Sequence, residues 1–367
     1  MVNTFILLTP SLHTGGGSER VLVNLANFLS NKGFNIKILT IIKGVQPFYE
    51  LNPNTSIHRF HFGYFMDYFS RFSITKLLDR WFGHLFLEKN ISSLFNMNSD
   101  YVISFSANLS IQCAQTKFAS CLMAFEHLPL RKYHSSLKML YQINNLYPAI
   151  NRVIVLSESE KILFEQMGCH VFRMTNSFTR LPSKCSQLGN KIVLSVGHIN
   201  TQKRRDLLIH AWHYVQIRHP DWKLYIVGDG PLKEQLEAMI DNFNLTDSVQ
   251  IFPPTDSIHL FYEQASVFVL SSELEMLPLV VLEAKSYGLP CVAFNIAPGP
   301  VEQINHNEDG FLVDFGDCRS MGECINKLIE NPDLRISMGV RGRKDVIKRY
   351  SPNVVEKLWE QLLNEIQ

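Results

Sequence analysis

The sequence predicts an α/β protein made of two doubly wound, Rossmann-like domains in tandem. The chain has 367 residues, more than one typical hydrophobic core accommodates. Short apolar runs alternate with segments of helical spacing along its length, and a polar stretch over 177–190 interrupts this alternation once. Short buried strands that alternate with helices are typical of parallel sheets covered on both faces.

In the first half, apolar runs predict strands at 5–9, 35–42, 101–106, 121–126 and 152–156. Between the first two, apolar residues recur at helical spacing: Val21, Leu22, Leu25, Phe28 and Leu29. Ser18 is the expected N-cap of this helix, and Gly33 is its stop signal.

In the second half, the predicted strands are 191–197, 223–228, 249–252, 267–270 and 290–294, and Asp206 is the expected cap of the first helix. We therefore expect a first domain over 1–178, a linker over 179–190, a second domain over 191–350 and a final helix over 351–367. Whether that helix crosses back to the first domain stays open. Two such domains are expected to face each other across a cleft at the carboxyl ends of their sheets, where ligands of these folds bind.

The composition excludes several classes of protein. With 46% hydrophobic and 19% charged residues the chain is globular, and a formal net charge of +1 argues against a nucleic-acid partner. The first residues lack the features of a signal peptide, and no apolar run is long enough to span a bilayer. The seven cysteines include no C-x-x-C pair, so we interpret them as reduced thiols of a cytoplasmic protein.

Three glycines, Gly15, Gly16 and Gly17, lie between the first strand and the first helix. Glycines there let the backbone approach a phosphate or a sugar, and the helix N-terminus favours negative charge. A tight turn that needs positive φ explains them equally well. The dinucleotide fingerprint G-x-G-x-x-G fails because Arg20 stands at the place of its third glycine.

Lys203 follows the strand that ends at Gly197. A lysine at the carboxyl edge of a parallel sheet can neutralise a diphosphate leaving group, whereas a lysine in a basic run is often only a solvated surface residue. After the next strand, Gly228 and Gly230 either make room for a nucleotide or form an ordinary turn.

A further segment places Glu275 in a loop after a strand, Pro278 at a helix start and Glu283 inside that helix. Glu283 falls on an apolar side, where an unpaired carboxylate is costly, so a partner is expected. Sugar hydroxyls are good partners for a carboxylate, and the alternative is an internal salt bridge to Lys285 or to a distant arginine.

Glu275 and Glu283 form an E-x7-E spacing, and here the chain resembles glycosyltransferase family 4, whose members are retaining enzymes of the GT-B fold. The resemblance also rests on GGGSERVLVNLANFL, SVGHINTQKRRDLLIHAW, VGDGPLKEQLE and APGPVEQINHNEDGFLV, in the order and spacing of the family. It covers nearly the full length and is weakest between about 48 and 100.

The resemblance implies a role for each matching position. Glu283 is expected to bind the nucleotide ribose, and Glu275 is expected to bind the donor sugar together with the backbone of Met276 and Leu277. Lys203 and the amides near Leu279 and Val280 are expected to bind the diphosphate. His127 is expected to lie beside the reacting sugar, and Gly16 and Gly17 are also expected at the substrate. Two positions depart from the family: many members have Arg at His198 and Gly at Met276. The first change places more of the phosphate stabilisation on Lys203, and the second alters the donor-sugar pocket.

The implied reaction is a retaining hexosyl transfer in which the leaving diphosphate helps to deprotonate the acceptor. No D-x-D motif occurs, so we expect a metal-independent enzyme without a cofactor, the nucleotide-sugar being a substrate. The alternatives are a sugar-nucleotide epimerase of the same fold, a non-catalytic sugar-nucleotide-binding partner protein and, more distantly, a nicotinamide oxidoreductase.

The segment 298–304 resembles members that use UDP-linked hexoses or N-acetylhexosamines, with a lipid-linked saccharide of a bacterial surface polysaccharide as acceptor. The expected location is the cytoplasm, at the inner face of the plasma membrane. Aromatic and basic residues over 64–90, including Arg71, Lys76 and Arg80, predict contact with an anionic membrane surface. A core helix with the buried stripe Leu77, Leu78, Trp81 and Leu85 is the alternative.

Overall fold

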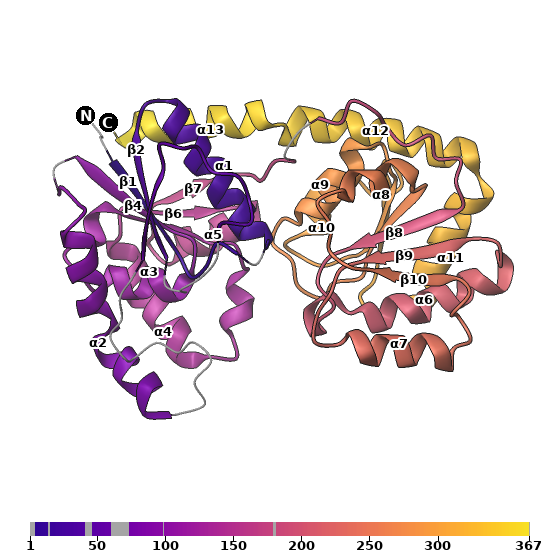
Figure 1. Cartoon of the computed structure of the whole chain (residues 1–367), viewed down its shortest axis with the longest axis horizontal. Helices are drawn as coiled ribbons and strands as arrows, with labels where there is room; N and C mark the ends of the chain where they lie inside the picture. The colour runs from indigo at the N-terminus through magenta and orange to yellow at the C-terminus, as the bar shows by residue number, and fades with distance from the viewer. Residues whose placement is uncertain are drawn as a thin grey trace. The chain divides into compact units, whose positions relative to one another are not determined.

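The computed structural model describes residues 4–13, 15–40, 46–59, 73–97, 99–178 and 181–366, with the backbone alone at 59 and 73–82. The chain divides into two compact units, Met1–Thr175 with Glu356–Gln367 and Asn176–Val355 (Figure 1). Each unit contains one sheet in which every pairing of neighbouring strands is parallel. The expected fold class of two doubly wound Rossmann-like domains is confirmed.

The sheet of the first unit has the strand order β3-β2-β1-β4-β5-β6-β7. Its strands are β1 (Thr4–Thr9), β2 (Asn35–Thr40), β3 (Ser56–Arg59), β4 (Asp100–Ser104), β5 (Leu122–Phe125), β6 (Arg152–Val155) and β7 (Val171–Arg173). Its helices are α1 (Gly17–Asn31), α2 (Ser73–Ser92), α3 (Ala107–Ala114), α4 (Leu137–Leu146) and α5 (Glu158–Gln166), with 3₁₀ turns η1 (Ala119–Cys121), η2 (Leu130–Tyr133) and η3 (Tyr147–Ala149). All six residues of β1 are buried, as expected for a central strand covered on both faces.

The last helix, α13 (Pro352–Ile366), packs on the first unit from Glu356 onward. Trp359 is buried, and its ring lies 5.9 Å from the ring of Phe125 at the end of β5. Near the end of the helix, Glu365 forms an ion pair with Arg152 at 2.7 Å. The structure thus has the return to the first domain that the sequence left open.

The sheet of the second unit has the order β10-β9-β8-β11-β12-β13. Its strands are β8 (Ile192–Val196), β9 (Lys223–Val227), β10 (Val249–Phe252), β11 (Val267–Leu270), β12 (Cys291–Phe294) and β13 (Gly310–Val313). Its helices are α6 (Arg205–Arg218), α7 (Lys233–Asn242), α8 (Ile258–Gln264), α9 (Leu279–Ser286), α10 (Pro300–Gln303), α11 (Cys318–Glu330) and α12 (Pro332–Tyr350), with the 3₁₀ turn η4 (Thr201–Lys203). Alternate residues face opposite layers: Val193 packs with Trp212 of α6, and Leu194 packs with Val281 of α9.

The described residues of the predicted linker, 181–190, pack on the second unit. Ser186 N donates a hydrogen bond to Tyr287 O at 3.0 Å. Leu188 is buried, and its carbonyl oxygen accepts from Nε and Nη2 of Arg335 at 3.1 and 3.0 Å. The second unit itself begins at Asn176, before the predicted linker.

Two expected helix caps are wrong. α1 begins at Gly17 with Gly16 as its N-cap, so Ser18 lies inside the first turn. α6 begins at Arg205 after Arg204, which is left-handed with φ 45°, and Asp206 instead binds the Arg204 guanidinium at 2.7 Å. In both places the tight loop before the helix, rather than a capping side chain, determines the first helical residue.

The segment for which membrane contact was predicted is described only in part: Arg71 lies outside the described residues, and only the backbone of Lys76 and Arg80 is described. In the described part of α2, Leu87 and Ile91 are buried, whereas Leu85 and Phe86 are exposed. Among the residues that the structure describes, no helix is long and apolar enough to cross a membrane. Membrane contact stays a prediction.

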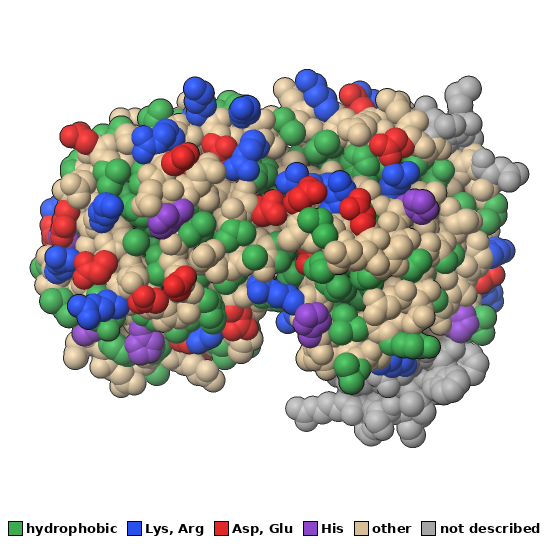
Figure 2. All heavy atoms as spheres, turned by 180° about the vertical axis from the view of Figure 1, so that it is seen from behind, with side chains coloured by type: hydrophobic (Ala, Val, Ile, Leu, Met, Phe, Trp, Pro, Cys, Tyr) green, Lys and Arg blue, Asp and Glu red, His purple; other side chains and the backbone are tan. Residues whose placement is uncertain are grey.

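Charges of both signs are mixed on the surface. Figure 2 shows acidic and basic side chains interspersed over one face of the molecule, in keeping with the formal net charge of +1. Several of them form exposed pairs, such as Arg218 with Glu323 at 2.7 Å. Such pairs contribute about 0–1 kcal/mol each, so the stability of the fold rests on its buried layers.

Candidate active site

Two loops at the carboxyl edge of the second sheet are joined by hydrogen bonds. The first loop, 197–204, links β8 to α6, and the second, 271–278, links β11 to α9. Gln202 Nε2 donates to Leu274 O at 2.8 Å, and Ser271 Oγ donates to Lys203 O at 2.8 Å. The connections after the neighbouring strands β8 and β11 leave in opposite directions, so these loops meet at the topological switch point, where such folds bind ligands.

Lys203 and Glu275 form an ion pair between these loops. Lys203 Nζ lies 2.6 Å from Glu275 Oε1, and Ser272 Oγ donates to the same oxygen at 2.7 Å. The side chains are only 19% and 10% exposed. The structure therefore brings together two of the residues that the sequence singled out, an ammonium that suits a phosphate and a carboxylate that suits hydroxyls.

A glycine supports Glu275 from the neighbouring loop. Gly299, the N-cap of α10, has φ 132°. A Cβ atom at Gly299 would lie 3.1 Å from Glu275 Cβ and 3.2 Å from Glu275 O, closer than most such contacts. The absence of a side chain at this position therefore helps to set where Glu275 stands.

If Glu275 binds the donor sugar, as the resemblance implies, Gly299→Ala is expected to lower the rate of the expected sugar transfer about tenfold or more, because the added methyl group displaces the carboxylate from its binding position. The positive φ adds a stability loss of about 1–2 kcal/mol. Gly316→Ala is the matched control, since Gly316 also has positive φ (87°) but a Cβ there would meet nothing within 4 Å. Turnover and denaturant unfolding of both variants test this; equal turnover would contradict a role in placing Glu275.

The glycines after β9 contact the neighbouring loop. A Cβ at Gly228 would lie 2.1 Å from Gly197 O, and one at Gly230 would lie 2.3 Å from Ile199 O. Loop packing thus accounts for both glycines. This agrees with an ordinary turn, one of the two interpretations that the sequence left open. His198 is exposed, and its Nδ1 lies 3.0 Å from Asp229 O, so the ring is directed to the turn after β9.

Helix α9 begins directly after the loop that carries Glu275. Pro278 is its N-cap, and the amides of Leu279 and Val280 belong to the first turn, whose N–H groups have no partner inside a helix. Met276 and Leu277 are buried. Their side chains are therefore withdrawn from the surface, in keeping with a role for their backbone.

Glu283 lies in the second turn of α9 and is half-buried. Its Oε2 accepts a hydrogen bond from Tyr262 Oη of α8 at 2.9 Å. The salt bridge to Lys285 that the sequence left open does not form, because the Lys285 ammonium binds Asp309 and Asp345 instead.

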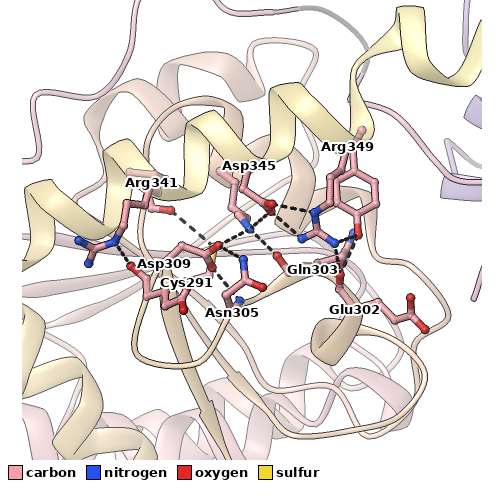
Figure 3. Close-up of polar contacts among 12 residues, drawn as sticks. Cys291, Glu302, Gln303, Asn305, Asp309, Arg341, Asp345 and Arg349 are labelled. Carbon is pink, nitrogen blue, oxygen red and sulfur yellow. Dashed lines mark hydrogen bonds and ion pairs between the residues drawn. The ribbon is translucent and has the colours of Figure 1, made fainter.

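Lys285 is the centre of a buried network that joins α9 to α10 and α12. Figure 3 labels three of its partners, Gln303, Asp309 and Asp345. Its side chain is fully buried, and Nζ lies 3.0 Å from a carboxylate oxygen of Asp309 and 3.0 Å from one of Asp345. Nζ also donates to Gln303 O, and Gln303 Nε2 donates to Pro278 O at 3.1 Å. The network therefore anchors Pro278, the N-cap of α9.

In the first unit, the turn that contains Gly15 is held by Glu19. Gly15 has φ 68°, as a tight turn requires, and α1 begins two residues later. Glu19 is buried and accepts hydrogen bonds from Gly15 N at 3.0 Å and from Ser11 Oγ. The turn explains Gly15, whereas substrate contact by Gly16 and Gly17 stays a prediction.

His127 follows β5 and packs against two aromatic rings. Its ring centroid lies 5.3 Å from that of Phe105 and 4.3 Å from that of Phe125. Its Nε2 is buried and has no hydrogen-bond partner among the described residues. Burial lowers the pKa of His127 to about 3, so at pH 7 the ring is neutral and offers hydrogen bonding rather than positive charge.

This neutrality makes a pH-dependent contribution to stability. The folded pKa of His127 lies below the value of about 6.5 in an unfolded chain, so its contribution is complete above pH 6.5 and is lost as pH falls toward 3. Between pH 7 and 5 the wild type is expected to lose about 1–2 kcal/mol more unfolding free energy than His127→Gln. Denaturant titrations at both pH values measure the difference.

The buried Glu126 has a pKa raised to about 7 by burial and acts with the opposite sign, but its effect cancels in the comparison of the two proteins. An identical pH dependence in wild type and variant would mean that the imidazole takes up its proton in the folded state.

Arg205, which is 2% exposed, was not predicted as a buried residue. Its helical spacing could have shown this: Arg205 precedes the buried residues Leu208, Ile209 and Trp212 by three, four and seven positions, which places it on the inner face of α6. Ser272 and Gly299 carried no comparable signal, since their contacts with Glu275 depend on how separate loops pack.

The fold and this site define a protein of two Rossmann-like domains with a paired cation and carboxylate at the switch point of the second. Residues 182–345 match the model of the family described as glycosyl transferases group 1. An uncharacterised glycosyltransferase of Haemophilus influenzae is 32% identical over 346 residues, which cover 91% of this chain and 92% of that relative. The chain therefore belongs to this family of glycosyltransferases.

Other relatives align over nearly the whole chain. The amylovoran biosynthesis glycosyltransferase AmsD of Erwinia amylovora is 26% identical over 98% of this chain and 99% of its own length. A Campylobacter jejuni enzyme is 24% identical over 99% and 98%, and is named as an α-1,4-N-acetyl-D-galactosaminyltransferase acting on a diNAcBac-PP-undecaprenol-linked saccharide. The structure of Anabaena HepE with UDP and glucose matches with a TM-score of 0.80 and 19% identity, over 99% of this chain and 100% of that one. The expected resemblance to bacterial surface-polysaccharide glycosyltransferases and the GT-B fold are both confirmed.

Proposed function

We propose that this glycosyltransferase moves a hexose or an N-acetylhexosamine from a UDP-linked donor to a lipid-linked saccharide, with retention of anomeric configuration, during assembly of a bacterial surface polysaccharide. The observation that carries the proposal is the Lys203–Glu275 ion pair at the switch point, directly before the first turn of α9. A diphosphate sugar needs cations and free amides for its phosphates and a carboxylate for its hydroxyls, and this region supplies all three.

In this scheme donor binding exchanges the ion pair for contacts with the ligand. The Lys203 ammonium turns to the diphosphate, and the Glu275 carboxylate accepts hydrogen bonds from hydroxyls of the donor sugar. Glu283 holds the ribose, with its carboxylate oriented by the hydroxyl of Tyr262. Ser272 keeps its hydrogen bond to Glu275, so the carboxylate stays in place when the lysine leaves.

The bond between the anomeric carbon and the diphosphate oxygen then breaks, and the acceptor oxygen forms the new bond on the same face of the sugar. The acceptor proton passes to the departing phosphate oxygen. Lys203 and the amides of Leu279 and Val280 stabilise the negative charge that develops on the leaving group. The neutral ring of His127 offers a hydrogen bond beside the sugar.

The relatives support the choice of acceptor and location. The Campylobacter enzyme is named for an undecaprenol-linked acceptor, and the Erwinia protein for the biosynthesis of amylovoran. The Anabaena structure holds UDP and glucose, which supports a UDP-linked donor. An enzyme of this kind works in the cytoplasm, where nucleotide-sugars are made, at the inner face of the membrane that carries its acceptor.

To test this, the purified protein is incubated with each of the UDP-linked hexoses and N-acetylhexosamines, with and without a membrane extract that carries lipid-linked saccharides. We expect release of UDP that depends on the extract, together with an acceptor mass increase of one sugar. Release of nucleotide without any acceptor would favour the epimerase. Neither release nor transfer with any UDP-sugar or GDP-sugar would favour a non-catalytic binding protein.

A second arm of the assay contains excess EDTA. Because the proposed leaving-group stabilisation comes from Lys203 and helix amides, transfer is expected to continue at its normal rate. Loss of transfer that Mn²⁺ or Mg²⁺ restores would show that a metal carries the charge instead.

A further inference from the structure

Arg205 is a buried guanidinium with no charged partner among the residues that the structure describes. It is the first residue of α6 and is 2% exposed. Its Nη1 donates to Ser195 Oγ, which is neutral, whereas Nε and Nη2 are buried and have no hydrogen-bond partner in the described part of the chain. A charge in this position is costly unless something compensates it.

The cost is visible in the protonation of the group. Burial lowers the pKa of Arg205 to about 10, and the negative charge of Glu275 opposes this shift. The guanidinium is therefore still charged at neutral pH, and the nearest compensation comes from an acid that already binds Lys203. In the free protein, two cations, Lys203 and Arg205, thus share the single negative charge of Glu275.

One of the unpaired nitrogens, Nη2, lies at the candidate donor site. A Cβ atom at Gly197 would lie 3.4 Å from Arg205 Nη2 and 3.7 Å from Lys203 Cε. The side chains of both cations therefore border the space beside Gly197, at the carboxyl end of β8, which is open because glycine has no side chain. The exposed ring of His198 is held at the turn after β9 by Asp229 O.

We infer that Arg205 is the second cation of the diphosphate site, and that the bound diphosphate supplies the counter-charge that this guanidinium lacks in the free protein. The inference rests on the proposed function and adds a residue to it. A planar guanidinium with several N–H groups suits phosphate oxygens better than a single ammonium does. The two cations then have different roles: Lys203 exchanges Glu275 for the diphosphate, and the buried Arg205 fixes the position of the phosphates.

A merely structural role predicts the opposite effect on stability. If Arg205 only tied α6 to β8 through Ser195, its replacement by methionine would lower stability and leave diphosphate binding unchanged. If its charge serves the ligand, Arg205→Met removes an uncompensated buried charge, so the melting temperature stays the same or rises. The affinity for a diphosphate falls in the same variant.

The experiment is calorimetric titration of wild type and Arg205→Met with UDP and with UMP, together with thermal unfolding of the free proteins. We expect UDP to bind about 10- to 100-fold more weakly to the variant, the size of a lost hydrogen bond to a charged group. UMP, which lacks the second phosphate, is expected to lose clearly less. Arg204→Gly is the matched control, because Arg204 pairs with Asp206 and its φ of 45° suits glycine; its UDP affinity should equal that of wild type.

Unchanged UDP affinity in Arg205→Met, or equal losses for UDP and UMP with a lower melting temperature, would overturn the inference. If the wild type binds GDP rather than UDP, the choice of donor base is wrong, and the same comparison with GDP and GMP decides the role of Arg205. If the wild type binds no nucleoside diphosphate, the proposed function and this inference both fail.

Discussion

Lys203→Ala is expected to lower the rate of sugar transfer at least about 100-fold, because it removes the cation that we propose stabilises the leaving diphosphate in the transition state. The free energy of unfolding should change by much less than this, because the Glu275 carboxylate keeps the hydrogen bond from Ser272 and the nearby positive charge of Arg205. Steady-state turnover with saturating donor, compared with denaturant unfolding, measures both effects.

Lys191→Ala is the matched control for this variant. Lys191 immediately precedes β8, at the opposite end of the strand from Lys203, and its ammonium pairs with Asp221 on the surface. Turnover of this control should equal that of wild type. Near-normal turnover in a well-folded Lys203→Ala protein, or an equal loss in both lysine variants, would contradict the assignment of the donor site.

Glu283→Ala is expected to reduce the rate of sugar transfer by a similar factor if Glu283 holds the ribose.

Glu275→Gln changes the other member of the Lys203–Glu275 ion pair. The double variant Lys203→Ala with Glu275→Gln is therefore expected to lose less of the transfer rate than the product of the two single losses.

The largest stability effect is expected for Lys285→Met. The substitution removes the central cation of the buried network and leaves Asp309 and Asp345 without it, which costs about 3–5 kcal/mol. Chemical denaturation of wild type and variant measures the loss. Lys344→Met, an exposed change beside Asp345 on α12, is the control and should shift the free energy of unfolding by less than about 0.5 kcal/mol.

Removing the buried partner charge as well should restore part of this loss. In Lys285→Met with Asp309→Asn the buried carboxylate of Asp309 is gone and Asp345 keeps its ion pair with Arg349 at 2.6 Å, so the double variant is expected to be more stable than the single one. A loss below about 1 kcal/mol in Lys285→Met would mean that the network contributes little and that α9 is held by its apolar contacts.

The central strands could be predicted from the sequence because burial on both faces requires apolar residues throughout, as in β1 and β11. The missed strands β3, β7 and β13 are all edge strands, which pair on one side only. In β3, SIHR offers no apolar run at all. The expected caps Ser18 and Asp206 failed for a different reason, since the geometry of the preceding loops determined where α1 and α6 begin.

The candidate site could be predicted in part. Lys203 and Glu275 each follow a strand of one parallel sheet, so their loops had to reach the same edge. Their direct pairing could not be read from the chain, because it depends on contacts between residues 72 positions apart. The partners of Lys285, Asp309 and Asp345, are likewise distant in sequence, so they could not be predicted. The sequence suggested Lys285 only as a possible partner of the nearby Glu283.

A crystal structure of the protein with bound UDP is the most direct test of the proposed donor site. We expect the diphosphate within hydrogen-bond distance of Lys203 Nζ and the amides of Leu279 and Val280, with the ribose on Glu283 and the Lys203–Glu275 ion pair opened. Nucleotide bound at the glycine turn of the first unit, or bound with that ion pair intact and no contact to α9, would contradict the proposed donor site.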